Sequence, residues 1–202
     1  MSDYRIVSNV TELPSTVYGH RSLMWWGTLG FIMIEGSTLF ICAISYFYIR
    51  RNFESWPPEH VLLPGLTIAT VQVALMVLSN IPMWWVDRAA RRVDLRSVQI
   101  GMVVCTTLAL AMCVLRAFEF RDLNVRWDSN AYGTVAWATV FAHGTLLLLE
   151  TLESIVFTVL LFSPNLEQRD LAGASDNAVY WYFLTLSWVP LYVIVYLSPY
   201  LM

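Results

Sequence analysis

Five long apolar segments, separated by short polar connections, constrain this 202-residue sequence more than any other feature. They cover about residues 22–50, 61–86, 97–120, 131–162 and 177–199. A helix of about 20 apolar residues crosses a hydrocarbon core of about 30 Å. Because 57% of the residues are hydrophobic and only 13% are charged, the chain has too little polar surface for a soluble globule. The sequence therefore predicts an all-α membrane protein, a bundle of five transmembrane helices.

The connections between these segments are too short for a separate soluble domain. We therefore expect residues 1–21 to form an N-terminal cytoplasmic segment and residues 22–202 to form a single transmembrane domain. The first twenty residues lack a basic region followed by an apolar region, so no cleavable signal is expected.

The arginines predict the orientation, because basic residues gather in cytoplasmic loops. The chain has no lysine, and its twelve arginines face fifteen acids. A cytoplasmic N-terminus places seven arginines inside (Arg5, Arg21, Arg88, Arg91, Arg92, Arg96 and Arg169) and four outside (Arg50, Arg51, Arg121 and Arg126). The C-terminus then ends outside. The charge is too mild and too scattered to indicate binding of nucleic acid.

The first apolar segment carries a single acid, Glu35, close to its midpoint. A carboxylate at that depth costs about 2.5 kcal/mol or more, so we expect it to be protonated, paired or turned inward. Thr28, Thr38, Cys42 and Ser45 share its helical face, which predicts that this face points into the bundle.

The fourth apolar segment carries a second polar stripe, made of Thr139, His143, Glu150 and Glu153. By helical rise, Glu35 and His143 lie at nearly the same depth, so the two side chains can face one another. The alternative is purely structural: small polar groups bind neighbouring helices through hydrogen bonds worth about 0.6–2 kcal/mol each.

Arg116 and Glu119 lie three residues apart near the outer end of the third segment. The spacing permits an ion pair, and two interfacial charges that reach toward the headgroups are the other interpretation. Pro190, inside the last segment, leaves the carbonyl of Leu186 without its helical donor and predicts a bend.

The sequence offers few cysteine or histidine ligands for a redox metal or haem. The three cysteines form no CxxC pair, and His143 is the only histidine inside an apolar segment. Haem and copper sites built from imidazole need several such histidines, so we expect no cofactor in this chain and assign no catalytic residue.

Four motifs, in this order, resemble subunit III of the haem-copper terminal oxidases of respiratory chains. The run WWGTLGFIMIEGSTLF, followed by YFYIR and WPP, is similar to a helix of that family whose glutamate matches Glu35. LRAFEF resembles a helix ending in which Glu119 is matched and Arg116 replaces a glutamine. Phe141-Ala142-His143-Gly144 and the run from Tyr180 to Tyr196 resemble two later motifs.

The resemblance covers nearly the whole chain from Arg21 and fits the short, five-helix form of the family. Three polar residues of the family pattern are replaced here, by Leu146, Tyr182 and Thr185, and Ala69 stands where the pattern has an asparagine. These losses place in doubt any polar network that such residues would build.

The resemblance implies an accessory subunit of a proton-translocating cytochrome c oxidase in the cell inner (plasma) membrane, without a catalytic centre of its own. Haem and copper would lie in partner subunits, subunit I would make direct contact, and structural phospholipid would fill a cleft. Candidates for supporting proton uptake or for lining this cleft are Glu35, Glu119, His143, Glu150 and Glu153. Candidates for binding lipid headgroups are Arg88, Arg91, Arg92 and Arg96, which on the alternative interpretation only fix the topology.

Two other functions stay open at this point. One is a subunit-III-like accessory protein of nitric oxide reductase, which companion chains would distinguish. The other is a small independent transporter, which needs a continuous polar path, whereas the intramembrane acids are few.

Overall fold

Five long helices form the protein, and the computed structural model describes residues 18–164 and 168–201. They are α1 (Leu23–Arg50), α2 (Leu66–Arg91), α3 (Leu95–Asp122), α4 (Ala131–Leu160) and α5 (Gln168–Tyr192). A short 3-10 helix, η1 (Gly19–Arg21), precedes α1, and a π-helical turn, η2 (Val193–Leu197), with α6 (Ser198–Leu201) continues α5. All five long helices are long and apolar enough to cross a membrane. The expected multi-pass membrane fold is confirmed.

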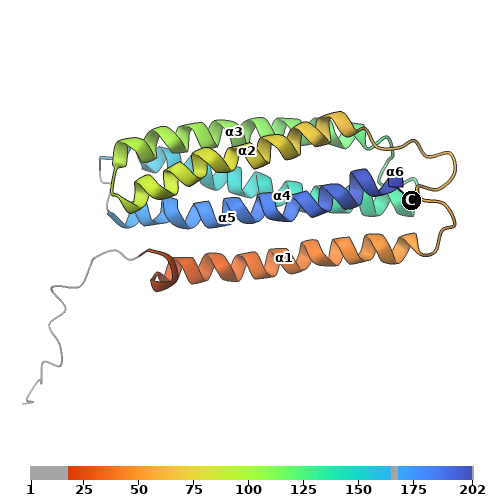
Figure 1. The fold of residues 1–202 in the computed structure, drawn as a ribbon, viewed down its shortest axis with the longest axis horizontal. Coiled ribbons are helices and arrows are strands. Elements are labelled where there is room, and N and C mark those ends of the chain that lie inside the picture. Colours follow the sequence, from red (N-terminus) through yellow and green to blue (C-terminus); the bar gives the residue numbers. More distant parts are fainter. Residues whose placement is uncertain (1–17, 165–167, 202) are drawn as a thin grey trace, which may run out of the picture.

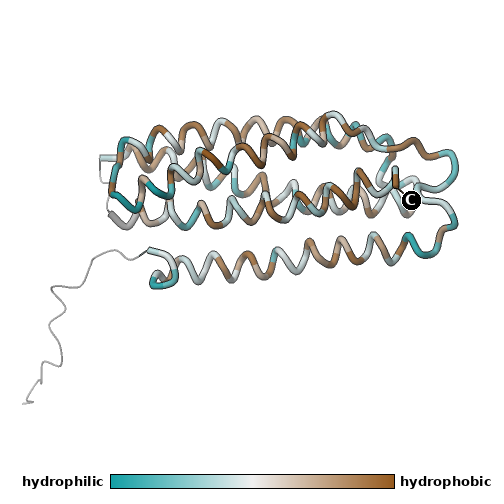
Figure 2. Tube along the Cα trace, in the orientation of Figure 1, coloured by the Kyte–Doolittle hydropathy of each residue, from teal (hydrophilic) through white to brown (hydrophobic). Residues whose placement is uncertain are grey.

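Successive helices run antiparallel, and α1 lies at one side of the bundle (Figure 1). α2 packs against α3 and α5, and α3 packs against α4, whereas α1 contacts only α4 and α5 extensively. Hydrophilic residues gather mostly at the two ends of the helices, as Figure 2 shows. The end of the bundle that contains the start of α1 and the α2–α3 turn is named the inner end. This name follows the orientation predicted from the arginines.

The helix bounds correct four of the expected spans. The second helix begins five residues later than expected, at Leu66, because Leu62 to Gly65 form the end of the preceding connection. The third runs slightly longer at both ends, and the fourth stops at Leu160. The last begins at Gln168, nine residues before the expected start, because polar residues follow the turn at Ser163 and hide the helix from a hydropathy pattern. Residues 1–17 of the expected cytoplasmic segment lie outside the described part of the chain.

Side chains cap two of the helices. At α3, the Asp94 carboxylate accepts hydrogen bonds from the Ser97 backbone N–H (3.3 Å) and from its hydroxyl (2.6 Å). At α4, the Asn130 side chain accepts from the Gly133 N–H at 2.7 Å. These contacts satisfy backbone donors that have no partner inside the helix.

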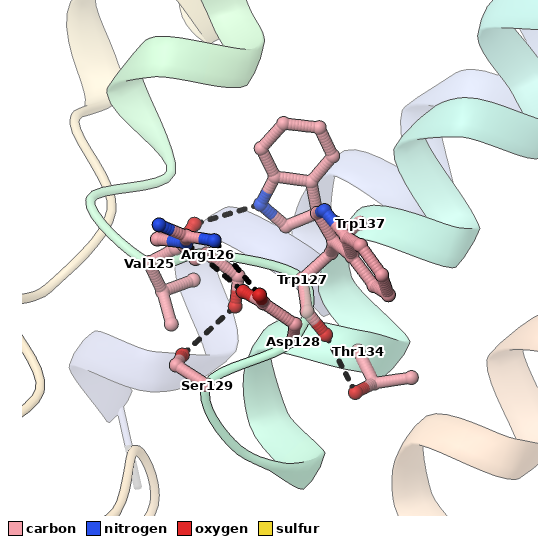
Figure 3. Close-up of polar contacts among 7 residues, drawn as sticks. All are labelled: Val125, Arg126, Trp127, Asp128, Ser129, Thr134 and Trp137. Atoms are coloured by element: carbon pink, nitrogen blue, oxygen red, sulfur yellow. Dashed lines mark hydrogen bonds and ion pairs between the residues drawn. The ribbon is translucent and has the colours of Figure 1, made fainter.

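The α3–α4 connection is held by side chains of α4 (Figure 3). The Trp137 indole N–H donates to the Val125 carbonyl at 2.7 Å, and the Thr134 hydroxyl donates to the Trp127 carbonyl at 2.8 Å. These bonds fix the start of α4 against the α3–α4 connection.

The outer end of α1 is attached through an aromatic cluster formed by Tyr46, Trp56 and Tyr132. The three rings meet edge to face at centroid distances of 5.1–6.5 Å. The Trp56 indole N–H donates to the Tyr46 hydroxyl at 2.8 Å, and this hydroxyl also lies 3.3 Å from the Ser198 hydroxyl. Edge-to-face pairs add about 0.5–1.5 kcal/mol each beyond their buried area. The cluster therefore joins α1, the α1–α2 connection, α4 and α6 at one point.

Candidate functional site

A cavity of about 840 Å³ separates the inner half of α1 from α4 and α5. Its walls mix apolar and acidic side chains from all three helices. The lining residues are Leu23, Met24, Trp26, Gly27, Thr28, Phe31 and Glu35 of α1, Leu149, Glu150, Glu153 and Phe157 of α4, and Gly173, Asp176, Asn177 and Tyr180 of α5. Cavities of about 300–1,000 Å³ are typical of sites for small ligands.

Glu35 faces this cavity and is paired, as the cost of a lone acid in the membrane predicts. The Tyr180 hydroxyl of α5 donates a hydrogen bond to Glu35 Oε2. Glu35 is half-buried, and it reaches α5 because Leu39 and Tyr46 on the same side of α1 are the buried contacts of that helix. The pair is a polar contact between α1 and α5 in the inner half of the bundle.

The polar stripe of α1 is only partly turned inward. Glu35, Cys42 and Ser45 are half-buried as expected, but Thr38 is exposed and bonds to the Ile34 carbonyl of its own helix. The buried line of α1 runs through Leu39 and Tyr46, so the apolar side chains rather than the small polar ones make its closest contacts.

Glu150 is almost fully buried between α4 and α5. Its Oε1 accepts hydrogen bonds from the Asn177 amide at 2.7 Å and from the Ser154 hydroxyl at 3.3 Å. Its Oε2 is buried without a partner among the described residues. Glu153, one turn further on, is exposed at the edge of the cavity. The α4 stripe therefore places one acid inside the bundle and one at its rim.

His143 does not pair with Glu35, although their similar depth permitted such a contact. It is fully buried, its Nε2 lies 3.0 Å from the Leu184 carbonyl, and its Nδ1 lies 3.2 Å from Arg116 Nη2. A guanidinium can only donate, so Nδ1 accepts and Nε2–H donates to Leu184. Both ring nitrogens are therefore occupied, on the side of α4 that faces α3 and α5, and similar depth did not imply a shared face.

Arg116 and Glu119 form an ion pair inside the bundle, which excludes the interfacial interpretation. Arg116 Nη1 lies 2.6 Å from Glu119 Oε2, and the two side chains are 5% and 0% exposed. The Arg116 guanidinium also lies over the Trp188 ring of α5, 3.7 Å from its centroid, and His143 lies against the same ring. This arginine cluster of Arg116, Glu119, His143 and Trp188 joins α3, α4 and α5.

The candidate headgroup arginines lie at the inner end, on α2, the α2–α3 turn and the start of α3. Arg88, Arg91, Arg92 and Arg96 are all exposed, and none of them lines the cavity. Arg88 lies over the Trp84 ring at 4.2 Å, and Arg91 pairs with Asp87 at 3.0 Å. Arg92 and Arg96 make no ion pair with a described residue.

Sequence reasoning missed three residues of the cavity, Asp176, Asn177 and Tyr180. They lie at the boundary or inside the expected last span, and Asp176 was assigned to the connection before it. Since α5 begins at Gln168, all three lie more than two turns inside the helix. Their spacing of one and three residues, which places them near one face of a helix, was the available signal.

The described residues contain no group of three or more His, Cys, Asp or Glu side chains placed to hold a metal ion. The cavity instead combines apolar walls with carboxyl and amide oxygens. Such a surface can hold a hydrocarbon chain and bind hydrogen-bond donors at one end.

Comparison with known protein families identifies the family to which this sequence belongs. The sequence profile of the family described as "Cytochrome c oxidase subunit III" matches residues 23–200, which include all five long helices. The chain belongs to this family. The resemblance drawn from the motifs around Glu35, Glu119 and His143 is thereby confirmed.

Three relatives show how low the sequence identity within this family is. Each is named "Cytochrome c oxidase subunit 3". The one from Synechocystis sp. is 22% identical over 200 residues, covering 94% of this chain and 83% of its own length. The relative from Schizophyllum commune is 28% identical, with 83% and 66% covered, and that from Oenothera berteroana is 22% identical, with 90% and 73% covered.

Proposed function

We propose that this chain is the non-redox subunit III of a respiratory haem-copper terminal oxidase of the cytochrome c oxidase type. In this role it stabilises the catalytic subunit, holds lipid and supports proton uptake during oxygen reduction. Family membership supports the assignment to an oxidase complex. The observation that carries the role is the inner cavity of about 840 Å³, whose walls combine apolar side chains with acidic ones and include the Glu35–Tyr180 pair.

The lipid part of the proposal rests on the walls of the cavity. Trp26, Phe31 and Phe157 offer aromatic surface to an acyl chain, and the cavity lies among three helices that are long and apolar enough to cross a membrane. Exposed arginines at the same end of the bundle can bind headgroup phosphates through charge-assisted hydrogen bonds; they are Arg88, Arg91, Arg92 and Arg96.

The proton part of the proposal rests on the carboxyl groups at the inner end. Glu35, Glu150 and Glu153 lie around one cavity, so a proton taken up at the rim has acceptors close by inside the membrane. In this role the acids supply protons to a neighbouring catalytic subunit, which carries the haem and copper, and this chain performs no redox step.

Co-purification tests the proposed function. Isolation of the tagged chain in mild detergent should retain a catalytic subunit I, with its haem spectrum, together with bound phospholipid. A nitric oxide reductase subunit in its place would support the alternative accessory role. A stable, active chain without any companion at every detergent concentration would contradict both assignments.

A further inference from the structure

A groove between α3 and α4 opens on the surface of the bundle beside the arginine cluster. Its volume is about 250 Å³, and its apolar walls are Ala117 and Phe120 of α3 and Phe141 and Leu148 of α4. Both helices are long and apolar enough to cross a membrane. The groove shares no lining residue with the inner cavity, so what it binds is independent of the lipid-holding role.

Arg116 lines this groove and has one donor unused. Its Nη1 donates to Glu119 and its Nη2 donates to His143, but its Nε–H has no hydrogen-bond partner among the described residues. The side chain is only 5% exposed, and a guanidinium keeps its protons in a protein, so Nε remains a buried donor. Buried donors normally have a partner, and this one indicates a ligand that supplies an acceptor.

Gly144 of α4 leaves Arg116 open to the groove. A Cβ atom at position 144 would lie 3.3 Å from Arg116 Cγ and 3.8 Å from its Nε. Any side chain there would therefore cover the guanidinium from the groove. Phe141, three residues earlier, is 65% exposed, so its ring can turn aside and admit an oxygen atom to Nε.

The other polar side chains of the groove already have partners within the chain. The Thr145 hydroxyl donates to the Phe141 carbonyl at 2.9 Å, and Cys113 Sγ lies 3.2 Å from the Thr151 hydroxyl. Arg116 is thus the lining residue whose donor is unused, and the ligand must bring the acceptor.

The charge of the arginine cluster favours a neutral acceptor. Glu119 already neutralises Arg116 at 2.6 Å, so a bound carboxylate or phosphate would add an uncompensated negative charge within the membrane-spanning helices. A carbonyl oxygen accepts the hydrogen bond without this cost. Phe120 and Phe141 also offer aromatic surfaces against which a flat ring can pack.

We propose that the α3–α4 groove binds the ring of a membrane quinone, with a ring carbonyl accepting a hydrogen bond from Arg116 Nε–H. An oxidised quinone ring is neutral and flat, and its carbonyl groups are acceptors without a donor. Its hydrocarbon chain extends over exposed apolar residues of the two helices, which include Val114, Phe118 and Leu152. Binding at this site involves no electron transfer.

Photolabelling of the intact complex tests the site. The purified oxidase complex is irradiated with an azido derivative of decylubiquinone, and mass spectrometry identifies the labelled peptides of this chain. We expect label on α3 and α4 around Phe120 and Phe141. Unlabelled decylubiquinone should prevent labelling at a concentration roughly tenfold lower than decylbenzene, which has the chain but no carbonyl; this ratio is equivalent to about 1.4 kcal/mol.

Two variants, each with a matched control, locate the site. Gly144→Ala covers Nε and keeps the arginine cluster, so labelling of the groove should fall several-fold; in the control Gly30→Ala, on α1, the added Cβ meets nothing within 4 Å. Leu148→Trp fills the groove from an exposed position and should have the same effect. Leu152→Trp, one turn further along α4 and outside the groove, should leave labelling unchanged.

Three outcomes would overturn the inference. Protection by laurate, an anionic acceptor, at a lower concentration than by decylubiquinone would assign the groove to a fatty acid. Equal protection by decylbenzene would show that the groove binds only hydrocarbon, without Arg116. Absence of label on α3 and α4, or full labelling of both Gly144→Ala and Leu148→Trp, would show that quinone does not bind here. None of these outcomes affects the proposed association with a catalytic subunit, which co-purification measures.

Discussion

Val93, in the α2–α3 turn, has a backbone conformation that its side chain opposes. Its φ is 58°, in the left-handed region, where a β-branched residue is strained. The turn needs this conformation, because the Asp94 N–H then bonds back to the Ala89 carbonyl at 3.0 Å and closes the end of α2. The turn is therefore formed at a local cost.

Glycine at position 93 should relieve this cost. We expect Val93→Gly to raise the free energy of unfolding by about 0.5–1 kcal/mol, since glycine adopts positive φ without strain but loses more chain entropy on folding. Unfolding in detergent by titration with sodium dodecyl sulfate measures the change. Val93→Ala is the control, and an equal gain from alanine would contradict the explanation by backbone strain.

Asp94 should make stability depend on pH at the inner end. Hydrogen bonds from Ser97 hold the pKa of the Asp94 carboxyl below its ordinary value. A carboxyl whose pKa is lowered in the folded state stabilises the fold above its unfolded pKa of about 3.9, and this contribution is lost as the pH falls through the lower, folded pKa. Asp94→Asn retains a capping oxygen but does not titrate. The drop in melting temperature between pH 7 and pH 3 should therefore be smaller in the variant, and an identical drop would contradict this account.

Glu35 should support turnover rather than perform it. Glu35→Gln keeps an oxygen that accepts from Tyr180, so the complex should assemble and its turnover should fall by well under about tenfold, or 1.4 kcal/mol. Glu35→Ala should harm assembly more, because the Tyr180 hydroxyl then loses its partner. Oxygen consumption and subunit content measure the two effects. An assembled but inactive Glu35→Gln complex would make Glu35 an obligatory proton carrier.

At the scale of elements, the guanidinium of Arg116 in the arginine cluster contacts side chains of α3, α4 and α5. Arg116 of α3 contacts Glu119, His143 of α4 and Trp188 of α5. A buried ion pair contributes little net stability compared with apolar packing, but the loss of one partner leaves an uncompensated charge. The cluster therefore specifies how α3, α4 and α5 meet.

Single and double substitutions should separate these effects. Glu119→Gln should lower the free energy of unfolding by about 3–5 kcal/mol, because Arg116 then keeps its charge without a counter-ion. The double variant Arg116→Met with Glu119→Gln should lose less than Glu119→Gln alone. Detergent unfolding of both variants measures this, and a double variant that is less stable than Glu119→Gln would contradict the charge explanation.

The sequence predicted the helix bounds well where a long apolar run defines the helix. It predicted them poorly where polar residues lie inside a helix. Hydropathy located α1 and the start of α4 within a residue or two, since nearly every position there is apolar. It missed the first turns of α5, where the bundle buries the polar residues Ser175, Asp176 and Asn177. It also could not assign a partner to His143, because depth along a helix says nothing about rotation around its axis.

At the scale of the whole molecule, the two ends of α1 are attached in different ways. Its outer end joins the aromatic cluster of Tyr46, Trp56 and Tyr132, whereas its inner half borders the cavity. Sequence patterns predicted five helices, but this asymmetry depends on how the bundle packs. The Glu35–Tyr180 hydrogen bond is one polar contact of the inner half, and just before α1 the Tyr18 hydroxyl donates to the Ala90 carbonyl of α2 at 3.2 Å.

Loss of the aromatic cluster should release α1 as a unit. Trp56→Ala should cost about 3–5 kcal/mol of stability, the usual loss for a large aromatic side chain that is 5% exposed. Hydrogen exchange in α1 should rise more than in α2 or α3. Trp127→Ala is the control, because Trp127 is 60% exposed and should change neither quantity. A uniform rise in all helices would show that α1 does not move independently.

The pairing of Glu35 with Tyr180 also has a consequence for biosynthesis. The two residues are 145 positions apart, so at about 5–20 residues per second the ribosome adds Tyr180 roughly 7–30 s after Glu35. During this interval the first helix leaves the translocon with its acid unpartnered. Its insertion must therefore depend on the apolar residues around Glu35, because α1 inserts into the bilayer before α5 has been synthesised.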